Sequence, residues 1–194
     1  MASLTSIYQQ IVDDPMNADM RVRGYVPVYT ASERSKIVIV GQAPGQKAQD
    51  SRKPWDDASG ILLRRWLGVT DEEFYDPDLI ALIPMDFYYP GKGAHGDLPP
   101  RKGFAEKWHP ELLRHMSDVQ LTILIGAYSQ GYYLGKRAKK NLTETVRAYE
   151  EYLPEYLPLV HPSPLNFRWR SKNPWFESDV LPIVSQKVDE ILNN

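Results

Sequence analysis

The chain contains no cysteine among its 194 residues. This absence excludes disulfide bonds, zinc sites with cysteine ligands, iron–sulfur clusters and cysteine nucleophiles. Long hydrophobic runs are also lacking, because none approaches the roughly 18 to 20 residues of a membrane span. The N-terminal segment MASLTSIYQQ has neither the basic nor the apolar region of a signal peptide. We therefore expect a cytoplasmic protein with no membrane contact.

The net charge is small as well, with 25 acidic residues against 23 Lys and Arg and a formal charge of −2. A globally basic surface for nucleic acid is thereby excluded, whereas a local basic groove is not. Hydrophobic residues make up 42% of the chain and charged residues 25%, which is typical of a soluble protein with a sizeable core. The 5 Trp, 12 Tyr and 16 Pro favour shaped loops that carry stacking surfaces.

Four short apolar runs predict the strands of a sheet. The run KIVIV at 36–40 is rich in β-branched residues and too short for a helix, so it predicts a strand covered on both faces. Three further strands are predicted at 79–83, 121–125 and 156–160. Helical patterns occupy 59–67, 104–116, 128–140, 142–152 and the stretch from 173 onward.

Strands that alternate with helices predict a three-layer α/β/α fold around a mostly parallel, four-stranded sheet. No repeat or linker interrupts the chain, so we expect a single domain over residues 1–194, with an N-terminal helix and lead-in segment at 1–35. We expect Ser59 to cap the helix at 59–67, and Asn141 with Glu144 is typical of a capping box.

Each predicted strand ends in a loop of unusual composition. These loops are GQAPG at 41–45, PMDFYYPGKG at 84–93, GAYSQG at 126–131 and HPSPLNFRWR at 161–170. Because ligands bind beyond the carboxyl ends of parallel strands, we expect the four loops to converge on one crevice.

The loop at 41–45 places glycines where the backbone must turn sharply and approach a ligand closely. It has neither the GxGxxG spacing of a dinucleotide site nor the GxxxxGK[ST] pattern of a phosphate loop. A purely structural turn between strand and helix therefore stands as the alternative.

The loop after the last strand, HPSPLN at 161–166, is more specific. Its two prolines stiffen the backbone, hold His161 at the strand end and push Leu165 outward. Arg168 and Arg170 then flank Trp169, an arrangement that suits contact with phosphates and bases but also a solvated loop.

In these motifs the sequence resembles the uracil-DNA glycosylase superfamily, from about Lys36 to the end of the chain. The glycine-rich first motif pairs with the HPSPL motif. Pro54-Trp55 followed by SGILL at 59–63 is similar to the superfamily's Pro-aromatic and small-Gly-x-Leu pattern. LIGA at 124–127 followed by Leu134-Gly135 is similar to its third strand and helix.

The resemblance implies a monofunctional DNA-repair glycosylase that hydrolyses the N-glycosidic bond of a flipped-out deaminated base, uracil in the first place. It implies that His161 hydrogen-bonds the departing base and that Leu165 wedges into the space it vacates. Trp55 would lie against the base, unless it is simply a core tryptophan. The other implied base-binding residues are Gly41 and Ala43, and the other implied DNA contacts are Pro44, Gly45, Ser163, Arg168 and Arg170.

The first motif departs from the superfamily pattern, which has a water-activating acid or an Asn at its second or third position. Gln42 and Ala43 stand there instead. Gln42 can orient a water but cannot act as a base. Asp56 or Asp57 could replace the missing acid, followed by Asp50, although helix capping or complementing the helix dipole is the more common role of such residues.

The superfamily's base-reading Asn also has no counterpart after the second predicted strand, where Pro84, Met85 and Asp86 stand. Asp86 or Asn166 would then supply the polar contacts to the base. The sequence leaves open which base is excised.

Two further features are less specific. The basic run of Lys136, Arg137, Lys139 and Lys140 either attracts phosphate or forms a solvated helix end. The segment 88–97 suits a lid or groove wall, and His95 with Asp97 in it offers thin support for a metal pair.

We thus expect a monomer that acts on DNA containing a deaminated base, without cofactor, metal or iron–sulfur cluster. One alternative is a DNA-binding protein that keeps the fold without the chemistry, motivated by Gln42 and Ala43. Another is an enzyme for a different base, such as hypoxanthine, or for a free nucleoside, motivated by Pro84.

Overall fold

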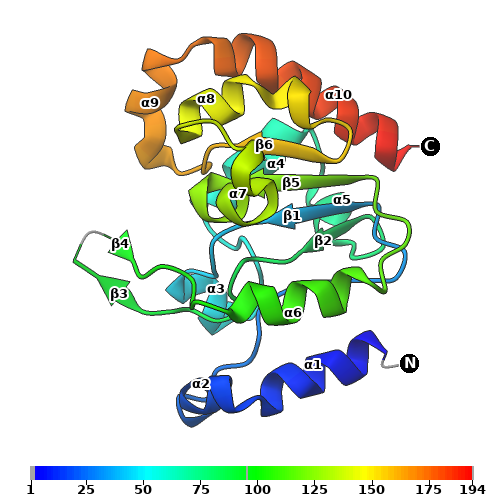
Figure 1. Cartoon of the computed structure of the whole chain (residues 1–194), viewed down its shortest axis with the longest axis vertical. Coiled ribbons are helices and arrows are strands. Elements are labelled where there is room, and N and C mark those ends of the chain that lie inside the picture. Colours follow the sequence, from blue (N-terminus) through cyan, green and yellow to red (C-terminus); the bar gives the residue numbers. More distant parts are fainter. Residues whose placement is uncertain (1–2, 95, 194) are drawn as a thin grey trace.

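The computed structural model describes residues 3–94 and 96–193. At its centre lies a four-stranded parallel sheet in the order β2-β1-β5-β6 (Figure 1). The predicted strands and their parallel arrangement are confirmed, each strand to within one residue at either end. The strands are β1 (Ile37–Val40), β2 (Ile80–Leu82), β5 (Leu121–Ile125) and β6 (Tyr156–Leu159).

Alternating side chains of β1 divide the core into two parts. Ile37 and Ile39 pack with α4, α8 and α10 on one face of the sheet, and Val38 and Val40 pack with α1, α6 and α7 on the other (Figure 1). Because helices cover both faces, the fold is the expected three-layer α/β/α arrangement. These helices are α1 (Leu4–Asp13), α4 (Ala58–Leu67), α6 (Phe104–Leu113), α7 (Gly126–Leu134), α8 (Leu142–Arg147) and α10 (Leu181–Leu192).

The remaining elements are short. A two-residue antiparallel hairpin, β3 (Lys92–Gly93) with β4 (Gly96–Asp97), follows the loop after β2. Over residues 3–94 and 96–193, no helix combines the length and apolar character that a membrane crossing needs. The other helical segments are α2 (Ala18–Val22), α3 (Gln46–Ser51), α5 (Asp71–Tyr75), α9 (Phe167–Lys172), 3-10 turns at 15–17, 135–137, 149–152 and 164–166, and a π-helical segment, Phe176–Val180.

Several predicted helices differ in extent. The helix expected at 128–140 begins at Gly126 and ends at Leu134, because Gly135 adopts a positive φ of 51°. The helix expected at 142–152 ends at Arg147, and a 3-10 turn follows it. At its start, the Asn141 side chain accepts a hydrogen bond from the Glu144 backbone N–H at 2.9 Å, which is one half of the expected capping box.

A buried ion pair joins the loop after β2 to the segment before α6. The fully buried Asp86 accepts hydrogen bonds from Nε and Nη2 of Arg101 at 2.7 and 2.8 Å, and from the backbone N–H groups of Tyr88 and Arg101 at 3.1 and 3.0 Å. Nη1 of Arg101 donates to the Met16 carbonyl at 3.0 Å and to Oδ1 of Asn17 at 2.8 Å. The pair therefore ties the N-terminal helices to the loops beyond the sheet.

Substitution Asp86→Ala should lower the free energy of unfolding by about 3–5 kcal/mol, because it leaves the Arg101 charge in its site without its partner. Urea denaturation of the purified variant measures this change. Glu155→Ala is the control, since its pair with Arg137 is exposed and should contribute no more than about 1 kcal/mol. Equal losses in the two variants would contradict a structural role for the buried pair.

Candidate active site

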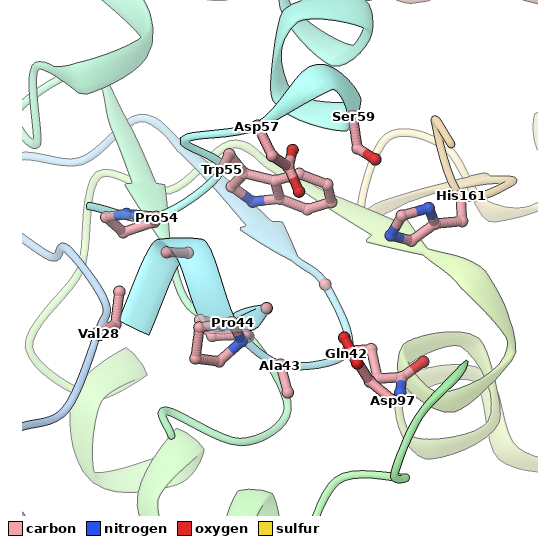
Figure 2. A pocket seen from close by; sticks show the side chains of 14 residues that line it. Val28, Gln42, Ala43, Pro44, Pro54, Trp55, Asp57, Ser59, Asp97 and His161 are labelled. Carbon is pink, nitrogen blue, oxygen red and sulfur yellow. The ribbon is translucent and has the colours of Figure 1, made fainter. Parts of the chain in front are cut away.

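Loops beyond the carboxyl ends of β1, β2 and β6 open onto one pocket with a volume of about 220 Å³ (Figure 2). Three of the four loops that were expected to converge therefore contribute to it. The pocket is lined by Val28, Gly41, Gln42, Ala43, Pro44, Gly45, Ala48, Pro54, Trp55, Asp57, Ser59, Pro84, Asp97 and His161.

The fourth loop, after β5, has a structural role instead. Gln130 is buried, and its Nε2 donates to the Leu124 carbonyl at 3.2 Å and to the Leu159 carbonyl at 2.9 Å. Buried Ser129 donates to the Ile125 carbonyl at 3.0 Å. These bonds hold the ends of β5 and β6 together and so fix the position at which the His161 loop begins.

Two glycines make room for Trp55 on the pocket wall. A Cβ on Gly41 would lie 2.8 Å from Cζ2 of the Trp55 ring, and a Cβ on Gly60 would lie 1.8 Å from the Trp55 carbonyl oxygen. Trp55 itself has a positive φ of 57°, and the Tyr75 hydroxyl donates to its carbonyl at 3.3 Å. The ring packs partly against the core and also lines the pocket.

The loops after β1 and β2 run side by side. The backbone N–H of Met85 donates to the Gly41 carbonyl at 2.8 Å, and that of Asp86 donates to the Gln42 carbonyl at 3.1 Å. Nε2 of Gln42 donates to the Leu98 carbonyl at 3.1 Å, just beyond β4. Gln42 therefore links the first motif to the β3–β4 hairpin and keeps its Oε1 as an acceptor.

A buried histidine supports Pro84 from behind the pocket. Nε2–H of His109 donates to the Pro84 carbonyl at 2.9 Å, and its Nδ1 accepts from the Tyr133 hydroxyl at 2.6 Å. Burial lowers the pKa of His109 to about 4, so the ring stays neutral at physiological pH. This histidine is a structural support and does not line the pocket.

His161 lies half-buried at the end of β6. Its ring centroid is 5.7 Å from that of Trp55, with 33° between the ring planes. Nδ2 of Asn166 donates to the His161 carbonyl at 2.9 Å and so holds the start of the loop. Burial lowers the pKa of His161, while the charge of Asp57 opposes that shift. A neutral imidazole is therefore available as a hydrogen-bond donor.

An NMR titration should give His161 a pKa below the ordinary histidine value of about 6.5. In Asp57→Asn the pKa should fall further, because the variant removes the negative charge that stabilises the imidazolium. The Cε1–H shift of His161, assigned by comparison with His161→Ala, reports the titration. An unchanged or raised pKa in Asp57→Asn would contradict this coupling.

Asp57 is the N-cap of α4, in place of the expected Ser59, since its Oδ1 accepts from the Gly60 backbone N–H at 2.9 Å. It also lines the pocket. Asp56 is not among the lining residues and lies 4.0 Å from Nζ of Lys47. Asp50 accepts from Gln46 at 2.7 Å.

Asp57→Ala should lower the free energy of unfolding by about 1 kcal/mol through loss of the cap, whereas Asp57→Asn should retain the stability, since Asn caps equally well. Thermal and urea unfolding of the two variants measure the difference. Comparable losses in both would show that the carboxylate charge, and not the cap, is what stabilises the helix.

The two expected base readers do not reach the pocket. Asp86 is fully buried and bound by Arg101, so it offers no accessible oxygen to a base. The Asn166 side chain is hydrogen-bonded to the His161 carbonyl, and the residue supports the loop from outside the lining set. Neither side chain is therefore among the groups that the pocket presents to a ligand.

Asp97 lines the pocket instead, from β4 of the hairpin. Its Oδ2 is 3.9 Å from where a Cβ on Gly45 would stand, and its Oδ1 accepts from the Tyr89 hydroxyl at 3.4 Å. In the sequence Asp97 was notable merely as half of a pair with His95, which lies outside the described residues. In the described part of the chain, no group of three or more His, Asp or Glu residues could hold a metal ion.

The HPSPL loop presents apolar side chains to solvent. Leu165 is 84% exposed and Phe167 is 54% exposed, on the 3-10 turn at 164–166 and the start of α9. The Ser163 hydroxyl caps that turn by accepting from the Leu165 N–H at 3.2 Å. Arg168 is exposed, whereas Arg170 is half-buried and lies 3.7 Å from Glu177.

The basic run at 136–140 is largely paired with acidic side chains. Nη1 of Arg137 is 3.4 Å from Glu155, and Nζ of Lys139 is 2.5 Å from Glu151. Lys140 lies 3.0 Å from Glu144. These pairs favour the interpretation as a solvated surface over that of a phosphate-binding patch.

Comparison with known proteins gives one family and a related structure. The family model of the Uracil DNA glycosylase superfamily matches residues 27–184, a range that contains every residue lining the pocket. The chain is also similar to the solution NMR structure of "a putative Uracil DNA glycosylase from Methanosarcina acetivorans", at 16% identity and a TM-score of 0.47. That match covers 82% of this chain and 94% of the other.

Proposed function

The chain belongs to the uracil-DNA glycosylase superfamily, and from this premise we propose that it is a DNA-repair glycosylase. It hydrolyses the bond between deoxyribose and a deaminated base, and uracil is the expected substrate base. The observation that carries the proposal is the pairing of His161 with Trp55 in one pocket, directly beside the glycine loop at 41–45. An aromatic face and a hydrogen-bond donor are what a flipped pyrimidine requires.

Breaking the N-glycosidic bond places negative charge on the departing base and cationic character on the sugar. A neutral His161 would donate a hydrogen bond to the base carbonyl oxygen, where that charge accumulates. Burial favours this role, because it keeps the imidazole uncharged and removes water that would compete for the oxygen. The Trp55 ring would stack on the base and set its orientation.

Water must attack the sugar from the side opposite the base. Gln42 stands at the start of the first motif with Nε2 held by the Leu98 carbonyl, so its Oε1 can accept a hydrogen bond from that water. An amide cannot take up the proton that the attacking water releases. No lysine is among the described residues that line the pocket, which supports direct hydrolysis over a Schiff-base mechanism.

Leu165 fits the role of the wedge that enters the duplex as the base leaves it. The side chain is almost fully exposed on a turn stiffened by Pro162 and Pro164, so the backbone that presents it loses little freedom when it inserts. Ser163, Pro44 and Gly45 are the proposed phosphate contacts near the pocket. Arg168, and Arg170 if released from Glu177, would add charge attraction to the backbone.

Purified protein should release the base from oligonucleotides that carry one uracil, detected as strand cleavage after alkali treatment of the abasic site. His161→Ala should slow single-turnover release by about 10²–10³, the usual loss for one donor at a developing negative charge. Its affinity for abasic DNA should stay within twofold of wild type. Equal rates in variant and wild type would discard the role of His161.

Parallel substrates distinguish the alternatives. Release of hypoxanthine or xanthine without release of uracil would support a glycosylase whose substrate base is not uracil. Salt-dependent DNA binding without release of any base would favour a binding protein that keeps the fold alone.

A further inference from the structure

We infer that Asp97, on the β3–β4 hairpin, is the carboxylate that accepts the proton of the attacking water. This inference rests on the proposed function and supplies the acid that the first motif lacks. Neither Gln42 nor Ala43 can accept a proton at that position. Hydrolysis by an attacking water therefore requires a proton acceptor from another element of the chain.

In the described part of the chain, two carboxylates line the pocket, Asp57 and Asp97. Asp57 uses Oδ1 to cap α4, and its charge acts on His161. A second negative charge near the departing base would oppose the charge that develops there. Asp57 is therefore poorly placed to be the base in the reaction, although it is well placed to tune His161.

Asp97 lies on the other side of the pocket, beside Gln42 (Figure 2). The Leu98 carbonyl, one residue along the chain, accepts from Nε2 of Gln42 at 3.1 Å. The Asp97 carboxylate comes within 3.9 Å of the Cβ position of Gly45 at the end of the same loop. A water held by Oε1 of Gln42 would thus have the Asp97 carboxylate as its neighbour.

The hairpin is anchored although Asp97 is exposed. The backbone N–H of Leu98 donates to the Gly91 carbonyl at 2.8 Å, and the Tyr89 hydroxyl donates to Oδ1 of Asp97 at 3.4 Å. Three residues further on, Arg101 is held by the buried Asp86. These contacts fix both stems of the hairpin and restrict the positions that the carboxylate can occupy.

The step balances as a hydrolysis. The water oxygen forms a bond to C1′ of the sugar while the C1′–N bond breaks, and the bonding pair leaves with the base. Asp97 accepts one proton of the water and later returns it to solvent. The base leaves as an anion hydrogen-bonded to His161 and takes up a proton from solvent. The negative carboxylate also stabilises the cationic sugar before the water attacks.

Single-turnover base release by Asp97→Asn, Asp57→Asn and Asp118→Asn tests the inference. Asp97→Asn should lose about 10²–10⁴ in rate, the range for a general base, with unchanged affinity for abasic DNA. Asp97→Glu should recover part of the loss. Asp118→Asn is the matched control, because Asp118 is exposed before the amino end of β5, and it should equal wild type. A larger loss in Asp57→Asn than in Asp97→Asn would overturn the inference.

A binding measurement separates this inference from the proposed function. Wild type should bind DNA with a cationic pyrrolidine abasic analogue at least tenfold more tightly than DNA with a neutral tetrahydrofuran analogue. Asp97→Asn should lose that preference, while Asp57→Asn should keep most of it. A wild type that shows no preference for the cation would overturn the assignment of Asp97 even if base release is observed. A preference lost in Asp97→Asn, without release of any base, would support the assignment and contradict the proposed enzyme activity.

Discussion

The ion pair between Asp86 and Arg101 is the constraint on which the surroundings of the pocket depend. It lies where three parts of the chain meet: the loop after β2, the stem that leads from the hairpin to α6, and the turn between α1 and α2. Burial of the Asp86 charge is costly in itself, so the pair contributes to stability chiefly because an arrangement without it would leave that buried charge unpaired. The ion pair thereby fixes the position of the N-terminal segment relative to the pocket.

The pocket also depends on the absence of side chains at particular positions. Trp55 occupies space that a Cβ on Gly41 or Gly60 would claim, and it does so in a left-handed backbone conformation. Gly41 is therefore required by the indole ring of Trp55, and Gly60 is required by its backbone carbonyl. The motif GQAPG forms the turn that follows β1 and also lines the pocket.

The sequence predicted the sheet well because buried parallel strands are nearly continuous apolar runs. It placed His161 at the pocket through its position at the carboxyl end of the last strand, whereas Trp55 was expected there from the family resemblance. It could not predict which carboxylates reach the pocket. Asp86 looked available in the sequence, but the Arg101 that binds it is distant in the chain. Asp97 reaches the pocket through a hairpin of two residue pairs, too short for any periodicity to show.

The length of the β3–β4 hairpin determines which side chain it directs into the pocket. Side chains in a strand point alternately to opposite sides, so the side to which Asp97 points is set by the parity of its place in the strand. Inserting or deleting one residue between Gly93 and Asp97 would exchange it with a neighbour, although composition and charge would barely change. The number of residues in this hairpin therefore determines which side chain faces the pocket.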